Sequence, residues 1–382
     1  MDQPNQSQGQ NFVNEAVWLP AKLAEFAIKP APYTAPLANE IVVRNHAVAV
    51  NPIDWLLPAI GGIAFPWLKY PFILGSDVAG EVVAVGTNVS RFQVGDRVLG
   101  QAVGGHKTRN NPAEGGFQLF TVLLEHMTTP IPHDMAYENA AVLPLGLSTA
   151  ACGLFEKDQL ALNHPSAHPR PTGKTLLVWG GSTSVGSNAI QLAVAAGYEV
   201  ITTASPKNFD YVKKLGATEV FDYNSKTVIA DVINAFNGRT IAGAIAIGHG
   251  SATACIKILS RCKGDKFMAM ATPPISLDDA PLRGNRMAWL IPTMAKLIGA
   301  NVGLMLKCRM RGIRTKFIFG TSLVDNEVGP MIYAEFLPQA LAEGRYTAAP
   351  DPLVIGHGLN QIPAALEAQK KGVSARKLVV ML

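Results

Sequence analysis

A glycine-rich turn near the middle of the chain restricts the possible fold more than any other feature. The apolar run Thr175–Trp179 leads directly into Gly-Gly-Ser-Thr-Ser-Val-Gly at 180–186, and a helical pattern follows from Ser187. Glycine lets the backbone turn tightly and approach a pyrophosphate, while a helix N-terminus offers unpaired N–H groups and a positive dipole end. This order predicts a dinucleotide site whose contacts come from Gly181, Ser182, Thr183, Ser184 and Val185.

Alternating strand and helix patterns surround this turn. Strands are predicted at 199–203, 219–221 and 242–247, and helices at 145–154, 187–196, 209–215 and 228–236. Such alternation is typical of a doubly wound parallel sheet with helices on both faces. We therefore expect an α/β fold with a Rossmann-type sheet, followed by a helix near 332–342 and a closing strand at 377–381.

The end of the second predicted strand bears on the choice of cofactor. An Asp or Glu about 20 residues after the glycine turn would bind the adenosine ribose of NAD. The sequence there is Ala-Ser-Pro-Lys-Asn at 204–208, with no acid. Ser205 and Lys207 supply a hydroxyl and a cation that suit a 2′-phosphate, which favours NADPH. The alternative is that Lys207 is an ordinary solvated lysine.

The first third of the chain has a different pattern. Short β-branched runs at 40–44, 47–50, 78–85 and 96–99 are separated by Gly, Pro and Asn, which indicates an antiparallel, barrel-like β domain. Residues 1–12 are expected to form a disordered tail. A chain of 382 residues with 48% hydrophobic residues fits two domains with a sizeable core.

Charge and cysteine content exclude several classes of function. The net charge of +5 is too mild for a nucleic-acid-binding protein. The four cysteines are far apart, with no C-x-x-C pair, so neither a disulfide framework nor a thiolate metal cage is expected. The N-terminus lacks a basic start followed by an apolar run. A reducing, cytoplasmic setting is the expectation.

Two further segments carry predictions of their own. Met287–Leu306 is apolar but contains Pro292 and Lys296, so we expect a buried or cleft-lining segment rather than stable membrane insertion. Lys307, Arg309 and Arg311 in the basic run 307–316 would share one face if extended. That face is either a solvated edge strand or a docking surface for an acidic carrier protein.

Several motifs together resemble the medium-chain dehydrogenase/reductase superfamily, especially its quinone-oxidoreductase and enoyl-reductase branch. They occur in family order at 48–54, 71–81, 94–98, 115–117, 141–150, 180–186 and 215–223. The stretch 205–209 looks most similar to fungal zinc-oxidoreductase-like proteins and to the trans-acting enoyl reductases of polyketide assembly. The resemblance implies a GroES-like β-barrel substrate domain at 13–147 and 330–382. A Rossmann NADPH-binding domain would lie between them at 148–329, with the active site in the cleft.

The resemblance also implies roles for individual residues. Asn51, Asp54 and Thr149 match positions at the catalytic end of the cleft, although Asn51 and Asp54 also suit turn-forming or structural roles. The matching cofactor positions are Ser148, Thr149, Tyr223, Gly248, Phe319 and Thr321. Zinc-using members hold their metal through a Cys and a His. Asn51 and Ser76 stand at those positions here, so no metal site is expected.

These expectations define an NADPH-dependent, metal-independent reductase. Without a Lewis acid to polarise an alcohol, hydride transfer to an activated C=C bond or a quinone is favoured over alcohol oxidation. The substrate is expected to be a small molecule, either free or bound to a carrier protein, and the chain a monomer or homodimer. Two alternatives stay open: a zinc-free carbonyl or alcohol dehydrogenase, and a non-catalytic NADPH-binding protein.

Overall fold

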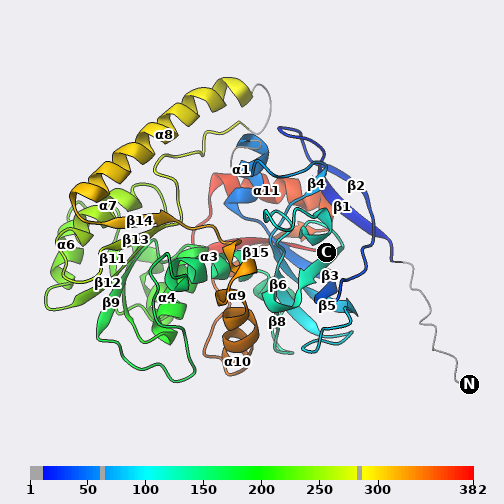
Figure 1. Ribbon diagram of the computed structural model, residues 1–382, viewed down its shortest axis with the longest axis horizontal. Coiled ribbons are helices and arrows are strands. Elements are labelled where there is room, and N and C mark those ends of the chain that lie inside the picture. Colours follow the sequence, from blue (N-terminus) through cyan, green and yellow to red (C-terminus); the bar gives the residue numbers. More distant parts are fainter. Residues whose placement is uncertain (1–11, 61–64, 282–285) are drawn as a thin grey trace, which may run out of the picture.

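The computed structural model describes residues 12–60, 65–281 and 286–382. Two sheet-based domains lie side by side (Figure 1). Residues 1–11 of the expected tail lie outside the described residues. Its last residue, Phe12, has its ring stacked on Tyr33 at 4.8 Å and belongs to the folded part.

The barrel domain contains a mainly antiparallel seven-stranded sheet in the order β15-β16-β3-β5-β6-β8, with β7 also paired to β3. Its C-terminal strands close the sheet because β16 pairs antiparallel with β3. The seven strands are β3 (Glu40–Ala49), β5 (Asp77–Val85), β6 (Arg97–Gln101), β7 (Phe120–Leu124), β8 (Thr128–Pro130), β15 (Asp351–His357) and β16 (Arg376–Met381). A smaller sheet consists of β1 (Asn14–Leu19), β2 (Ala27–Ala31) and β4 (Phe72–Ile73). The helices are α1 (Pro52–Ile60), α2 (Tyr137–Ala140) and α11 (Ile362–Lys371).

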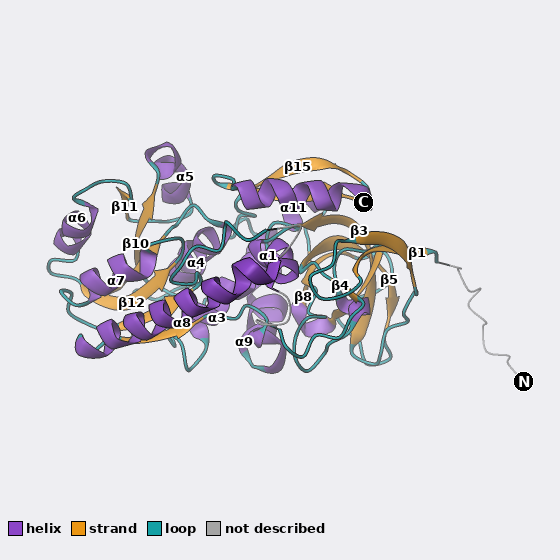
Figure 2. Cartoon of the chain, turned by 90° about the horizontal axis from the view of Figure 1, so that it is seen from above, coloured by secondary structure: helices purple, strands orange, loops and turns teal. Residues whose placement is uncertain are grey.

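The second domain contains a parallel six-stranded sheet in the order β11-β10-β9-β12-β13-β14. Its strands are β9 (Lys174–Trp179), β10 (Glu199–Ala204), β11 (Glu219–Asp222), β12 (Thr240–Ala246), β13 (Phe267–Met270) and β14 (Arg314–Phe317). Helices on both faces complete the predicted α/β fold (Figure 2): α3 (Pro144–Phe155), α4 (Ser184–Ala195), α5 (Phe209–Lys214), α6 (Val228–Ala235), α7 (Ser251–Leu259) and α8 (Arg286–Met310). The chain then passes through α9 (Val328–Pro330), a π-helical segment (Met331–Phe336) and α10 (Leu337–Ala342).

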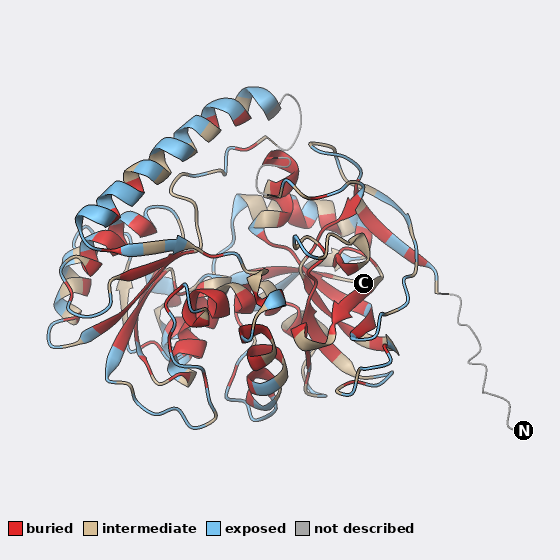
Figure 3. Cartoon of the chain, viewed as in Figure 1, coloured by how far each residue is buried: buried red, intermediate tan, exposed pale blue. Residues whose placement is uncertain are grey.

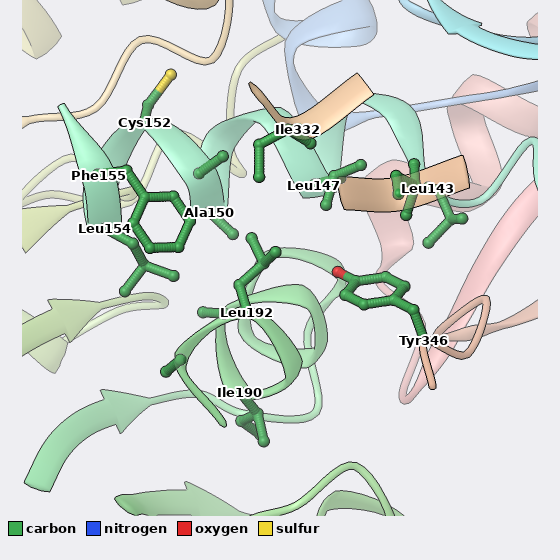
Figure 4. Close-up of a cluster of buried hydrophobic side chains, with 14 of the residues drawn as sticks. Leu143, Leu147, Ala150, Cys152, Leu154, Phe155, Ile190, Leu192, Ile332 and Tyr346 are labelled. Atoms are coloured by element: carbon green, nitrogen blue, oxygen red, sulfur yellow. The ribbon is translucent and has the colours of Figure 1, made fainter. Parts of the chain in front are cut away.

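Helices α3 and α4 pack directly against each other beside the glycine turn. Leu147 and Ala150 of α3 and Leu192 of α4 are fully buried and point toward one another between the two helices (Figure 4). Gly146 permits the close approach, because an added Cβ there would lie 2.3 Å from Ser184 Oγ. The predicted domain boundary at 147/148 falls inside α3, so this helix continues from one predicted domain into the next.

Two sequence-based expectations were wrong. Met287–Leu306 is not buried: it forms most of α8, whose outward side is exposed to solvent (Figure 3). Lys307 and Arg309 lie in the last turn of this helix, so a spacing of two does not place them on one face. Only Arg314–Phe317 is extended, and it is an edge strand of the sheet.

Candidate functional site

The carboxyl ends of the parallel strands gather the predicted cofactor residues at one edge of the sheet. Because the strands run in the same direction, the residues that follow them meet at this edge. These residues are Gly180 after β9, Ser205 after β10, Tyr223 after β11, Gly248 after β12 and Phe319 after β14. Strand order reverses at β9, between β10 and β12, which is where such sheets bind nucleotides.

The glycine turn is narrow enough that side chains would block it. Gly180 adopts φ +91°, which other residues rarely do. A Cβ on Gly186 would lie 2.2 Å from the Gly180 carbonyl oxygen, and one on Gly181 would lie 2.2 Å from Thr202 Oγ1. Thr183 caps α4 by accepting from the Gly186 N–H at 3.0 Å. The turn thus presents the N-terminus of a twelve-residue helix, which fits a pyrophosphate.

Ser205 and Lys207 lie directly after β10, at the carboxyl edge of the parallel sheet. The Ser205 hydroxyl accepts from Asn208 Nδ2 at 3.1 Å, and the same amide donates to Ser374 Oγ in the barrel domain. Lys207 is exposed in the short turn that follows β10. Tyr223 is 45% exposed beside this end of the sheet.

A buried polar network lies at the start of α1 and brings together four residues of the barrel domain. Asn51 Nδ2 donates to Asp77 Oδ2 at 2.8 Å, and the Asn51 backbone N–H donates to Asp54 Oδ2 at 2.8 Å. Lys377 Nζ lies 2.8 Å from the same Asp77 oxygen and also donates to Asn51 Oδ1. All four residues are at most 5% exposed. The amide of Asn51 therefore has a fixed orientation, with its oxygen toward an ammonium and its nitrogen toward a carboxylate.

The network is connected to the second domain through α3. Asp77 Oδ1 accepts from the Leu145 N–H at 2.6 Å, which satisfies an N–H in the first turn of that helix. One turn later, Thr149 Oγ1 donates to the Leu145 carbonyl at 2.7 Å and faces Gly320, where an added Cβ would lie 2.5 Å away. Asn51 and Thr149, predicted separately, are thus both connected to Leu145 at the start of α3, Asn51 through Asp77 and Thr149 directly.

Gln101 is a further polar side chain at this junction. Its Nε2 donates to the Gly320 carbonyl at 3.1 Å, whereas its buried Oε1 has no hydrogen-bond partner among the described residues. A buried acceptor without a donor is costly, by about 1–3 kcal/mol, unless a ligand supplies the donor. Gly320 lies between Phe319 and Thr321, which the family resemblance predicts to flank the nicotinamide.

Burial changes the acidity of Asp54. Its carboxyl group is 3% exposed, and desolvation raises its pKa to about 7. The neighbouring charge of Asp77 raises the pKa further, while the Asn51 N–H and Lys377 oppose the shift. The neutral form of Asp54 is thus favoured up to near-neutral pH.

Ser148 is a correction to the predicted cofactor contacts. It is fully buried, and its hydroxyl lies 2.7 Å from the hydroxyl of Tyr333, which also donates to the Pro144 carbonyl. This places Ser148 in the core. Conversely, Asp77, Gln101 and Lys377 belong to the junction but were not predicted. Asp77 stands inside the motif 71–81, which was the available signal for it.

Two protein-family models match the chain. The alcohol dehydrogenase GroES-like domain matches residues 37–133, and the zinc-binding dehydrogenase model matches residues 184–261. Both models describe dehydrogenases and they match parts of the two domains, which indicates the oxidoreductase class.

Full-length relatives agree with this class. The dehydrogenase pigH of Monascus ruber is 54% identical over 371 residues, covering 97% of this chain and 99% of the relative. The trans-enoyl reductase himH of Aspergillus japonicus is 35% identical, covering 97% and 98%. The chain therefore belongs to the medium-chain dehydrogenase/reductase family.

Solved structures share the fold at low sequence identity. A quinone oxidoreductase of Escherichia coli, complexed with NADPH, superposes with a TM-score of 0.65 at 16% identity, covering 97% of this chain and all of that one. The CurK enoyl reductase superposes with a TM-score of 0.70 at 19% identity, covering 96% and 99%.

Proposed function

We propose that the protein is an NADPH-dependent reductase that works without a metal ion and transfers hydride to an activated C=C bond or a quinone. The observation that carries this proposal is the buried Lys377–Asp77–Asn51 network. The family resemblance assigns the zinc ligands of metal-using members to positions 51 and 76, where this chain has Asn and Ser. The Lys377 ammonium already lies against the oxygens of Asp77 and Asn51.

A zinc ion does not fit this donor set. Zinc prefers thiolate, imidazole and carboxylate ligands, and a dication placed beside a buried ammonium would be repelled. Among the described residues, no group of three or more His, Cys, Asp and Glu side chains could hold a metal. The family-model name that mentions zinc therefore does not transfer to this site.

The cofactor does fit the glycine turn. The backbone N–H groups at the start of α4 would hold the pyrophosphate, and Lys207 and Ser205 would meet a 2′-phosphate. Thr149 already uses its proton on Leu145, so its oxygen is available as an acceptor for the carboxamide N–H, together with Gln101 Oε1. Relatives include an Escherichia coli structure with NADPH bound, which supports the same cofactor here.

The reduced nicotinamide, when bound, supplies the hydride for the β-carbon of an enone, enoyl thioester or quinone. Negative charge then develops on the conjugated carbonyl oxygen. Asn51 carries two N–H groups, one of which donates to Asp77. We assign the other to the carbonyl oxygen, with Lys377 and Asp77 as positioning residues that prevent the amide from turning, while Asp54 holds the backbone N–H of Asn51. Solvent supplies the proton at the α-carbon.

The test follows loss of reduced-nicotinamide absorbance across quinones, enones, enoyl thioesters and ketones. We expect turnover with the first three classes, and an Asn51→Leu change should lower kcat more than tenfold while NADPH affinity stays within about twofold. Asn234→Leu, at an exposed position near the end of α6, is the matched control and should leave kcat unchanged. Turnover of ketones alone, or an activity that requires stoichiometric zinc, would refute the proposal. If no substrate is turned over although NADPH binds saturably, the alternative of a non-catalytic NADPH-binding protein is favoured.

A further inference from the structure

Helix α8 exposes a continuous apolar stripe. Six of its large side chains are more than half exposed: Ile291, Ile298, Val302, Met305, Leu306 and Met310. Ile291, Ile298, Val302 and Met305 follow one another at intervals of seven, four and three residues, so they lie along one side of the helix. A row of this kind differs from single exposed apolar residues, which need no explanation.

The opposite side of α8 already has its partners. Leu304 and Cys308 are buried in the apolar cluster of the second domain. Near its start, Trp289 packs against the apolar cluster of the barrel domain, and Figure 2 shows α1 next to this end of α8. The outward stripe is therefore a second apolar surface, separate from the side that attaches the helix to both domains.

The charges around the stripe have a single sign. From Met287 to Val324 the sequence has six Lys and Arg residues and no Asp or Glu. Arg314 and Lys316 are neutralised by Asp265 and Asp158. The other four cations are on α8 or directly after it. Within the described part of the chain none of these four forms a salt bridge: Lys296, Lys307, Arg309 and Arg311.

We propose that α8 is a docking helix that lies flat on an anionic lipid surface. Apolar side chains beside Lys and Arg, without acids, match a bilayer interface that has an apolar boundary and negative headgroups. The helix is about 36 Å long at 1.5 Å per residue. It forms an outer edge of the molecule (Figure 1), so the stripe can meet a plane.

Lys296 distinguishes a lipid surface from a second copy of the chain. It is exposed in the middle of the helix, one helical turn from the exposed Pro292 and Gly299, so it lies at the border of the stripe. In an interface between two α8 helices it would come close to the cations of both copies with no carboxylate from either helix, which is unfavourable. On a bilayer, the apolar stem can lie along the border of the stripe while the ammonium reaches the headgroups.

The helix is not placed to cross the membrane. Met287–Met310 is long and apolar enough to do so by length and composition. However, crossing would detach Leu304 and Cys308 from the core of the second domain. Surface docking requires no such change.

The experiment measures co-sedimentation of the full-length protein with vesicles of phosphatidylcholine, with and without phosphatidylserine. We expect binding to the anionic vesicles that weakens with added salt, and little binding to the neutral ones. The triple change Lys296→Gln, Lys307→Gln, Arg309→Gln should lower the partition coefficient about 100-fold, given about one kcal/mol per cation. The pair Ile298→Ser, Leu306→Ser should lower it at least tenfold.

Matched variants control for net charge and exposed area. Lys213→Gln, Lys214→Gln, Lys226→Gln removes the same charge elsewhere, and Leu37→Ser, Val94→Ser removes side chains that are 67% and 62% exposed on the barrel domain. Both controls should bind vesicles as the unchanged protein does. The proposal is overturned if anionic vesicles are not bound at low salt, or if the α8 variants bind as well as the controls. It is also overturned if the stripe variants instead dissociate a dimer in the absence of lipid.

Discussion

Replacing Asp54 by Asn tests whether the buried network keeps the carboxyl group of Asp54 protonated in the folded protein. The carboxyl group accepts the Asn51 N–H and is almost fully buried, and desolvation raises its pKa from 3.8 to about 7. Asn has the same shape and can keep that hydrogen bond through its oxygen. The change therefore removes the titration with little change in packing.

The sign of the effect follows from proton binding. Between pH 4 and pH 7 the folded state keeps the proton on Asp54 while the unfolded state has lost it, so the stability of the folded state falls as pH rises. The stabilisation by the protonated Asp54 is fully present below pH 3.8, the pKa in the unfolded state. It is lost as the pH rises to about 7, the pKa in the folded state. A shift from 3.8 to about 7 corresponds to about 4 kcal/mol.

The assay is denaturant unfolding of the wild-type protein and of Asp54→Asn at several pH values. At pH 4 the two proteins should be nearly equally stable, and by pH 8 the variant should be more stable by up to about 4 kcal/mol. Asp210→Asn, at an exposed carboxyl group on α5, removes the same charge and is the matched control. A stability difference between wild type and Asp54→Asn that stays constant with pH would refute the reasoning.

Three other changes probe the remaining parts of the site. Lys377→Met should destabilise the fold by about 3–5 kcal/mol because Asp77 is left as a buried charge, and adding Asp77→Asn should recover much of this loss in unfolding experiments. The pair Ser205→Asp, Lys207→Ala should raise the KM for NADPH at least tenfold while that for NADH changes little; equal effects would contradict the assignment. Gly186→Ala should lower both stability, by about 1–3 kcal/mol, and cofactor affinity, because its Cβ would lie 2.2 Å from a carbonyl oxygen of the turn; unchanged NADPH titration would contradict this.

The parallel sheet was predictable because its strands are buried on both faces. Such strands appear as continuous apolar runs with little alternation, as in β9 and β12. The helix predicted to begin at Ser187 begins at Ser184 instead, since the Thr183 cap sets its start. The common position of the residues assigned to the cofactor could be predicted for the same reason, because they follow those strands directly; their contacts with a cofactor stay a prediction.

The buried network could not be predicted in full. Asn51 and Asp54 lie in one motif, but Lys377 is more than 300 residues later, in the strand Arg376–Met381. Antiparallel pairing of β16 with β3 brings them together, with Val379 opposite Ala49. In the sequence alone, a lysine at the start of an apolar strand has the pattern of a solvated strand end. Only the pairing places its ammonium beside Asp77.

The error at α8 has a different physical cause. Apolar residues recur on both sides of this helix, so its sequence has the hydrophobicity of a buried segment although only the side with Leu290, Leu304 and Cys308 is buried. The charge pattern distinguishes the two explanations. The few charged residues at the ends of a core segment can be positive or negative. A helix that lies on an anionic lipid surface is attracted through Lys and Arg and repelled through Asp and Glu. The absence of Asp and Glu from 287 to 324 is thus the property that agrees with an exposed apolar helix. It also explains why Lys296 can stand in the middle of the apolar sequence without a carboxylate partner: its charge needs a polar headgroup region, not a salt bridge.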